Sequence, residues 1–123
     1  MDEKMTYQQR IGSEGEDFAA QYLQSRGFEI LDQNYHSRYG ELDLVAEHDR
    51  CIVFIEVKTR TSDRFGLPEA SVTPEKLEKI NNTGLLWLQD HPEAPDDWRI
   101  DVIAIIMDKD NKVTDIQHFI DID

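Results

Sequence analysis

The chain has 123 residues, enough for one domain with a modest core, and 39% of them are hydrophobic. Thirteen basic and 26 acidic residues give a formal net charge of −13, which repels polyanions and, taken alone, argues against nucleic acids and anionic membranes as partners. One cysteine excludes an internal disulfide framework and a cysteine-based zinc cluster. The sequence shows neither a signal peptide nor an apolar run that could span a bilayer, so we expect a cytoplasmic protein without membrane contact.

Two helices are predicted from the spacing of the apolar residues. The polar residues 1–9 are expected to be frayed, and helical periodicity then predicts a first helix over 10–26. Thr73 is typical of a helix N-cap, and it precedes a second helix over 74–89 whose first residue is proline.

Five strands complete the predicted single domain of residues 1–123. A loop over 59–72 carries Gly66 and Pro68. The element order α-β-β-β-α-β-β predicts an α/β (α+β) fold in which helices flank a mixed central sheet. The predicted strands span residues 28–35, 41–47, 51–58, 98–107 and 112–120.

Charged residues interrupt the two strongest strands, within the stretch GELDLVAEHDRCIVFIEVKTR at residues 40–60. Because side chains alternate between the faces of a strand, Glu56 and Lys58 share one face, and Glu41, Asp43 and Val45 share a face of the preceding strand. A turn of even length brings these two faces together, whereas an odd turn separates them. We expect a register with the opposed pairs Ala46–Cys51, Asp43–Phe54 and Glu41–Glu56, which makes Asp43 a diagonal neighbour of Glu56 at about 7–8 Å.

Two carboxylates that converge on one point repel each other, and a divalent cation relieves this repulsion. Asp43 and Glu56 are therefore candidate ligands of Mg²⁺ or Mn²⁺, and Glu16, at the edge of the apolar face of the first helix, is a third. Lys58 faces the same point and can stabilise an attacking water or a negatively charged phosphate. Acid, acid and lysine around a metal ion suit phosphodiester hydrolysis.

An ordinary ion pair is the alternative explanation of these charges. Polar residues at strand ends often reach solvent, and Glu56 or Glu41 can pair with Lys58 at little gain in stability. From the residues alone both interpretations stay open.

Several motifs lie along the chain in a fixed order: GxxGExxA at 12–19, GELD at 40–43, FIEVKTR at 54–60, FGxP at 65–68, Lys76, and RIDV at 99–102. In this combination they resemble the YraN-like family, small bacterial proteins of the restriction-endonuclease-like PD-(D/E)xK superfamily that are similar in layout to archaeal Holliday-junction resolvases. Leu42 stands where many members of the superfamily have proline before the first acid.

The resemblance implies a restriction-endonuclease-like fold, with metal-binding and catalytic roles for Asp43, Glu56 and Glu16, and a catalytic role for Lys58. It also implies DNA as a partner and suggests a homodimer. Because the screening length at physiological salt is about 8 Å, a local basic patch can act despite the net charge. The expected nucleic-acid contacts are Arg60, Lys76 and Arg99 from the resemblance and Arg38 from the basic residues near the hairpin.

The sequence thus predicts a metal-dependent endonuclease-like protein that hydrolyses DNA phosphodiester bonds in branched or structured DNA. The alternatives are a non-catalytic nucleic-acid-binding module on the same fold and a protein-interaction module with an idle site. The acid, acid and lysine set favours the enzyme, whereas the net charge favours the interaction module.

Overall fold

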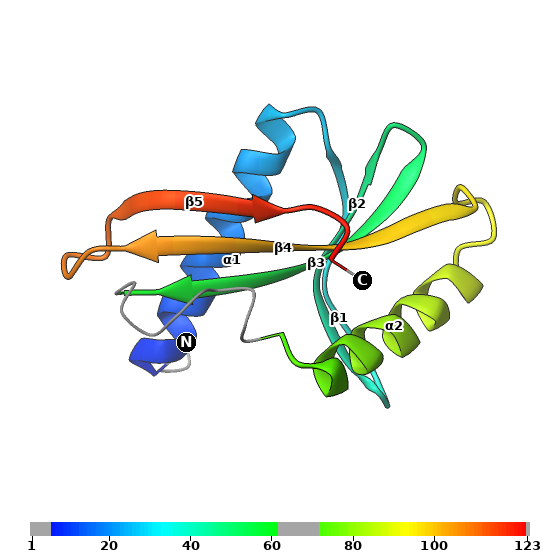
Figure 1. The fold of residues 1–123 in the computed structure, drawn as a ribbon, viewed down its shortest axis with the longest axis horizontal. Helices are drawn as coiled ribbons and strands as arrows, with labels where there is room; N and C mark the ends of the chain where they lie inside the picture. Colours follow the sequence, from blue (N-terminus) through cyan, green and yellow to red (C-terminus); the bar gives the residue numbers. More distant parts are fainter. Residues whose placement is uncertain (1–5, 62–71, 123) are drawn as a thin grey trace, which may run out of the picture.

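A single mixed sheet with helices on both faces forms the fold in the computed structural model, which describes residues 6–61 and 72–122 (Figure 1). The strands lie in sequence order, with β3 and β4 parallel and every other neighbouring pair antiparallel. The predicted element order and mixed sheet are confirmed. The loop residues Gly66 and Pro68 lie outside the described residues. The elements are α1 (Tyr7–Ser25), β1 (Glu29–Ser37), β2 (Gly40–His48), β3 (Cys51–Arg60), α2 (Pro74–Gln89), β4 (Asp97–Met107) and β5 (Val113–Phe119).

Both helices begin at threonine caps. At α1 the Thr6 hydroxyl accepts a hydrogen bond from Gln9 N, and the Gln9 side chain accepts one from Thr6 N, both at 3.0 Å. This capping box starts the helix at Tyr7, so residues 7–9 are helical rather than frayed. At α2 the Thr73 hydroxyl accepts from Lys76 N, and the helix has the predicted bounds.

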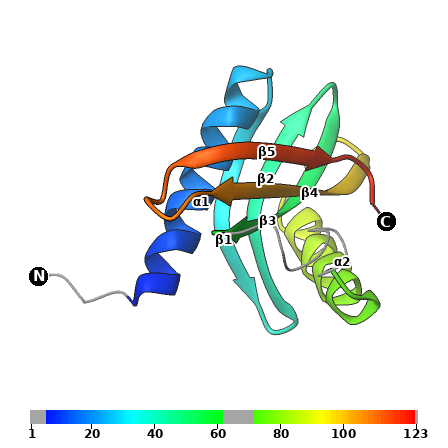
Figure 2. The ribbon, with the colours of Figure 1, turned by 60° about the vertical axis from the view of Figure 1, so that its left-hand side comes forward.

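The two helices lie on opposite faces of the sheet, as Figures 1 and 2 show. On the α1 face, Leu23 packs with Val53, Ile55 and residues of β4. On the α2 face, Trp87 packs with Phe54 and residues of the neighbouring strands. The sheet therefore carries a buried layer on each side, and its central strands are apolar on both faces. None of the described helices is long and apolar enough to cross a membrane.

The β2–β3 turn has the predicted even length but a different register. It contains only two residues, Asp49 and Arg50, which both have positive φ (51° and 63°), as a type I′ hairpin requires. His48 therefore pairs with Cys51. The predicted pairs Ala46–Cys51, Asp43–Phe54 and Glu41–Glu56 are wrong by two residues, because the turn is two residues shorter than expected.

Regular alternation in β2 breaks at Asp43. Leu42 and Val45 both pack in the α2-side core although they are three residues apart, whereas Leu44 packs on the α1 side. Asn34 in the adjacent strand has a φ of 54° at the same level. The predicted common face of Glu41, Asp43 and Val45 is therefore wrong, because the paired strands deform at this point.

Candidate functional site

Asp43 lies where β2 and β3 stop pairing. Leu44 and Ile55 form the last pair of the ladder, and beyond it Asp43 Oδ2 accepts a hydrogen bond of 2.8 Å from Val57 N. Burial raises the pKa of Asp43 to about 7, and the charge of Glu56 adds to this effect, while the Val57 hydrogen bond opposes it. A carboxyl group thus takes the place of a strand partner in surroundings that disfavour its charge.

Glu56 carries two ammonium partners. Its Oε2 atom lies 2.7 Å from Lys76 Nζ and 3.3 Å from Lys58 Nζ, and the residue is 8% exposed. Burial and the neighbouring Lys76 lower the pKa of Lys58, although Glu56 opposes them. Burial alone would lower the pKa of Lys76 too, but its hydrogen bonds to Glu56 and Lys58 raise it. Lys58 is therefore the more readily deprotonated of the two lysines.

Glu16 reaches toward the same place from α1. Burial raises its pKa, a hydrogen bond with Asn34 opposes the shift, and the charges of Glu41, Asp17 and Glu56 add to it. The helix comes close because Gly15 packs against Thr59, whose Oγ1 would lie 1.9 Å from a Cβ at position 15. Glu16 thus lies within electrostatic reach of the β3 carboxylate.

The donor set fits a hydrated divalent ion better than a closed cage of protein ligands. Within residues 6–61 and 72–122, no three His, Cys, Asp or Glu side chains are grouped as a metal site. Mg²⁺ commonly uses one or two carboxylates and retains several waters. Asp43 and Glu56 could supply those two carboxylates, since Asp43 is half-buried, Glu56 is buried, and the two repel each other. The ligand role of Glu16 stays a prediction.

The four basic residues expected at nucleic acid are distributed over the molecule. Lys76 lies at the centre of the site, and Arg60 lies at the end of β3 beyond Lys58. Arg38 lies in the β1–β2 turn, where its guanidinium packs on the Tyr39 ring, 4.9 Å from the ring centroid.

Arg99 is not close to the site. It is opposite Val53, three residues or about 10 Å along β3 from Glu56. Its guanidinium binds Asp101 through Nε at 3.0 Å and Nη2 at 3.2 Å, and it lies near Phe28 on the α1 face. The structure therefore places Arg99 in a separate ion-pair network.

Two contacts of the site were not anticipated from the sequence. Lys76 was expected at nucleic acid, yet its closest partner is Glu56. Asn34, which lowers the pKa of Glu16, was assigned no role. The Thr73 cap places Lys76 in the first turn of α2, but the position of that turn relative to β3 depends on packing of the whole helix. No local pattern shows it.

The mixed sheet, with Asp43 on one strand and Glu56 and Lys58 on the next, defines a restriction-endonuclease-like protein. A search against protein-family models agrees with the resemblance found in the sequence. Residues 15–105 match the family described as "Uncharacterised protein family UPF0102", and the chain belongs to this family.

Curated relatives match over most of their length. A UPF0102 protein of Syntrophomonas wolfei is 48% identical over 98 residues, which are 80% of this chain and 85% of the relative. A UPF0102 protein of Syntrophus aciditrophicus is 43% identical over 83% of this chain and 80% of the relative. One of Vibrio parahaemolyticus is 45% identical over 78% of this chain and 80% of the relative.

Proposed function

We propose that the protein is a metal-dependent endonuclease that hydrolyses phosphodiester bonds in branched or structured DNA. The observation that carries the proposal is the pair of half-buried Asp43 and buried Glu56, with Lys58 and Lys76 on the second carboxylate. Two acids that repel each other in a site shielded from solvent, beside two lysines, serve no packing purpose, and they match the needs of phosphate chemistry.

Each residue has a distinct part in this proposal. Asp43 and Glu56 hold Mg²⁺ or Mn²⁺, which would polarise a phosphoryl oxygen and neutralise its charge. Lys58, with its lowered pKa, is suited to take a proton from the attacking water. Lys76 stays protonated and stabilises the charge that develops on the phosphate. Glu16 would assist from α1.

Cleavage assays with Mg²⁺ and Mn²⁺ on duplex, single-stranded, flap and four-way DNA test the proposal. We expect Asp43→Asn, Glu56→Gln and Lys58→Met each to reduce cleavage by at least about 100-fold. Lys79→Met is the matched control for Lys58→Met, because Lys79 is an exposed lysine of α2, and it should cleave like the wild type.

Two results would refute the proposed nuclease activity. One is a lack of cleavage on all four substrates, and the other is cleavage that Asp43→Asn leaves unchanged. Salt-sensitive DNA binding without cleavage would instead support the non-catalytic module. The ion pairs of Glu56 with Lys58 and Lys76 favour that second candidate, because they neutralise the charge of the carboxylate without a metal ion.

A further inference from the structure

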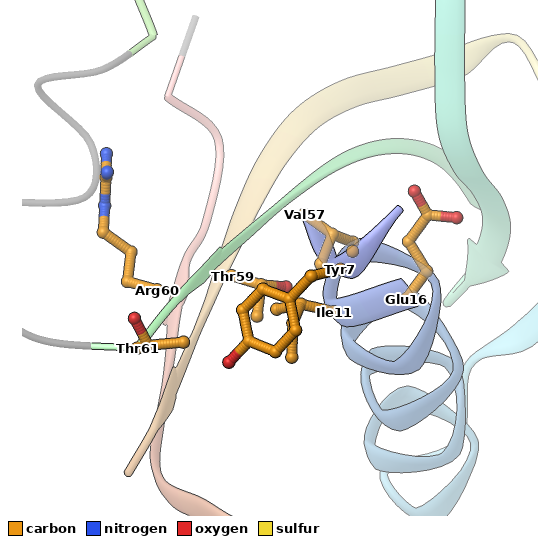
Figure 3. A pocket seen from close by; sticks show the side chains of 8 residues that line it. Tyr7, Ile11, Glu16, Val57, Thr59, Arg60 and Thr61 are labelled. Atoms are coloured by element: carbon orange, nitrogen blue, oxygen red, sulfur yellow. The ribbon is translucent and has the colours of Figure 1, made fainter. Parts of the chain in front are cut away.

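A pocket of about 430 Å³ lies beside the carboxylate site, between the first half of α1 and the end of β3 (Figure 3). Tyr7, Ile11 and Gly12 line it from α1, and Val57 and Thr59 line it from β3. Glu16, Arg60 and Thr61 complete the lining. Glu16 acts electrostatically on both Asp43 and Glu56, and the backbone N of Val57 binds Asp43, so the pocket adjoins the candidate active site on the α1 side of β3.

Gly12 leaves space that the folded protein does not use. Apart from the two neighbouring residues and the backbone of α1 itself, no atom of the described residues lies within 4 Å of a Cβ built at Gly12. Glycine in a helix interior lowers stability relative to alanine. Gly15, one turn later, is different, because Thr59 occupies the space of its side chain. Gly12 is therefore not explained by packing, and the space above it is available to a ligand.

The walls of the pocket are mainly uncharged, and one is aromatic. The Tyr7 ring is 54% exposed, yet its hydroxyl donates a hydrogen bond of 3.0 Å to Asn111 Oδ1, which fixes the ring in place. Ile11 and Val57 add apolar surface, and Thr59 adds a hydroxyl group. The Arg60 side chain points away from Tyr7 in Figure 3. A fixed, exposed ring with apolar neighbours suits a flat, uncharged group that stacks, such as a nucleobase.

The size and position of the pocket limit what can enter it. A volume of about 430 Å³ is in the lower range of small-molecule sites, and it admits one nucleotide but no base pair. Thr59 follows Glu56 by three residues, about 10 Å along β3. A strand with its phosphate at the carboxylates can therefore place a nearby base in the pocket, provided that this base is unpaired.

We propose that the pocket between α1 and β3 binds one unpaired nucleobase of the DNA strand, stacked on Tyr7, next to the phosphate held at Asp43 and Glu56. The inference rests on the proposed function, and it adds that the enzyme selects DNA with an unpaired nucleotide near the cleavage point. Gly12 keeps the pocket open.

Binding of two DNA duplexes tests this proposal, one fully paired and one with a single unpaired 2-aminopurine. Fluorescence anisotropy gives both affinities, in EDTA and in Ca²⁺, and the emission of 2-aminopurine reports stacking. We expect the wild type to bind the duplex with the unpaired base about 10-fold more tightly and to quench its emission.

Variants of the pocket should remove this preference. Gly12→Leu fills the pocket and Tyr7→Leu removes the ring, so each should bind the two duplexes with affinities within about 2-fold. Ser13→Leu adds the same side chain at the next, exposed position of α1 and should keep the preference. Thermal unfolding checks that all three variants fold, and Tyr7→Leu gives an independent test if Gly12→Leu fails to fold.

The outcomes separate this inference from the proposed function. The wild type could bind the two duplexes equally well, or the preference could survive both Gly12→Leu and Tyr7→Leu. Either result would refute base binding in the pocket, even if DNA is cleaved. A preference that depends on the pocket, without DNA cleavage, would support base binding in the pocket and refute the nuclease activity. Failure of the wild type to bind either duplex would overturn both.

Discussion

Asp43 shows at the scale of one residue how burial creates a functional group. Its carboxyl group receives one hydrogen bond, from Val57, and lies among the charges of Glu56, Glu16 and Glu41. The surroundings hold its pKa near 7 rather than at the ordinary 3.8. Close to neutral pH the group therefore exists in both protonation states, which suits a residue that exchanges a proton for a cation.

This pKa predicts how Asp43→Asn changes the free energy of unfolding. Between about pH 4 and 7 the folded protein keeps a proton that the unfolded chain has released, so the stability of the wild type falls as the pH rises through this range. Asparagine carries no charge and can still accept from Val57 N. We expect the variant to be more stable than the wild type by roughly 1–3 kcal/mol at about pH 8 and nearly equal at about pH 4.

Urea unfolding at the two pH values measures this difference. Glu78→Gln, at an exposed acid of α2, is the control and should show little pH-dependent gain. A variant with the same stability difference at both pH values would contradict the pKa assigned to Asp43.

At the scale of the elements, the approach of α1 to β3 depends on Gly15. A Cβ at this position would lie 1.9 Å from Thr59 Oγ1 and 3.1 Å from Thr59 Cβ. Gly15→Ala therefore forces the helix or the threonine to move, and we expect a loss of roughly 1–3 kcal/mol of stability. Gly12→Ala, in open space on the same helix, should gain roughly 0.5–1 kcal/mol. Thermal and urea unfolding measure whether the free energy of unfolding falls for Gly15→Ala and rises for Gly12→Ala.

A variant of Thr59 tests whether its contact with position 15 causes the loss of stability. In a Thr59→Ala background, Gly15→Ala should cost clearly less, because the clashing hydroxyl is gone. An equal cost in both backgrounds would mean that the loss does not come from this contact.

The elements were largely predictable, but their register was not. The Thr73 cap and the apolar periodicity of α2 determine that helix locally, and both of its predicted ends are confirmed. The turn at Asp49 and Arg50 is different, because arginine does not favour positive φ and gives no local signal for a two-residue turn. The even length of the turn is confirmed, but the turn is two residues shorter than expected, which shifts every predicted pair by two residues.

At the scale of the whole molecule, Asp101 joins β4, β5 and the C-terminal segment. It is fully buried and accepts hydrogen bonds from Arg99 and from Asp121 N, with His118 Nε2 at 2.8 Å. Burial alone would raise its pKa, but the bonds to His118 and Arg99 lower it. The stabilisation is therefore present above the ordinary pKa of 3.8 and is lost as the pH falls through the lowered value.

Asp101→Asn should destabilise the protein by about 3 kcal/mol near neutral pH, because it leaves Arg99 partly buried without its counter-charge. Urea unfolding measures the change, and Asp17→Asn, an exposed acid of α1, should stay within about 0.5 kcal/mol of the wild type. A cost for Asp101→Asn as small as that of Asp17→Asn would contradict the role of this network.

The positions of residues along single strands were easier to predict from the sequence than the long-range pairing of charged residues. Asp43 and Glu56 lie on consecutive strands joined by a short turn, so the sequence predicted their proximity, although alternation breaks at Asp43 and the predicted register is wrong by two residues. Arg99 lies in β4, and its partners Asp101 and His118 are joined to it only by the folded sheet. Long-range pairing of this kind leaves no periodic pattern in the sequence. A charged residue such as Arg99 is then easily interpreted as a surface residue that contacts a partner.

The missing side chain of Gly15 also has a consequence for acid–base chemistry. Because Glu16 follows Gly15 directly, the depth to which α1 sinks onto β3 determines how strongly the Glu16 charge acts on Asp43. A larger residue at position 15 would lift the helix and weaken the contribution of Glu16 to the raised pKa of Asp43, which is smaller than the contributions of burial and of Glu56. The missing methyl group at position 15 thus contributes to the proton affinity of a carboxyl group on another element.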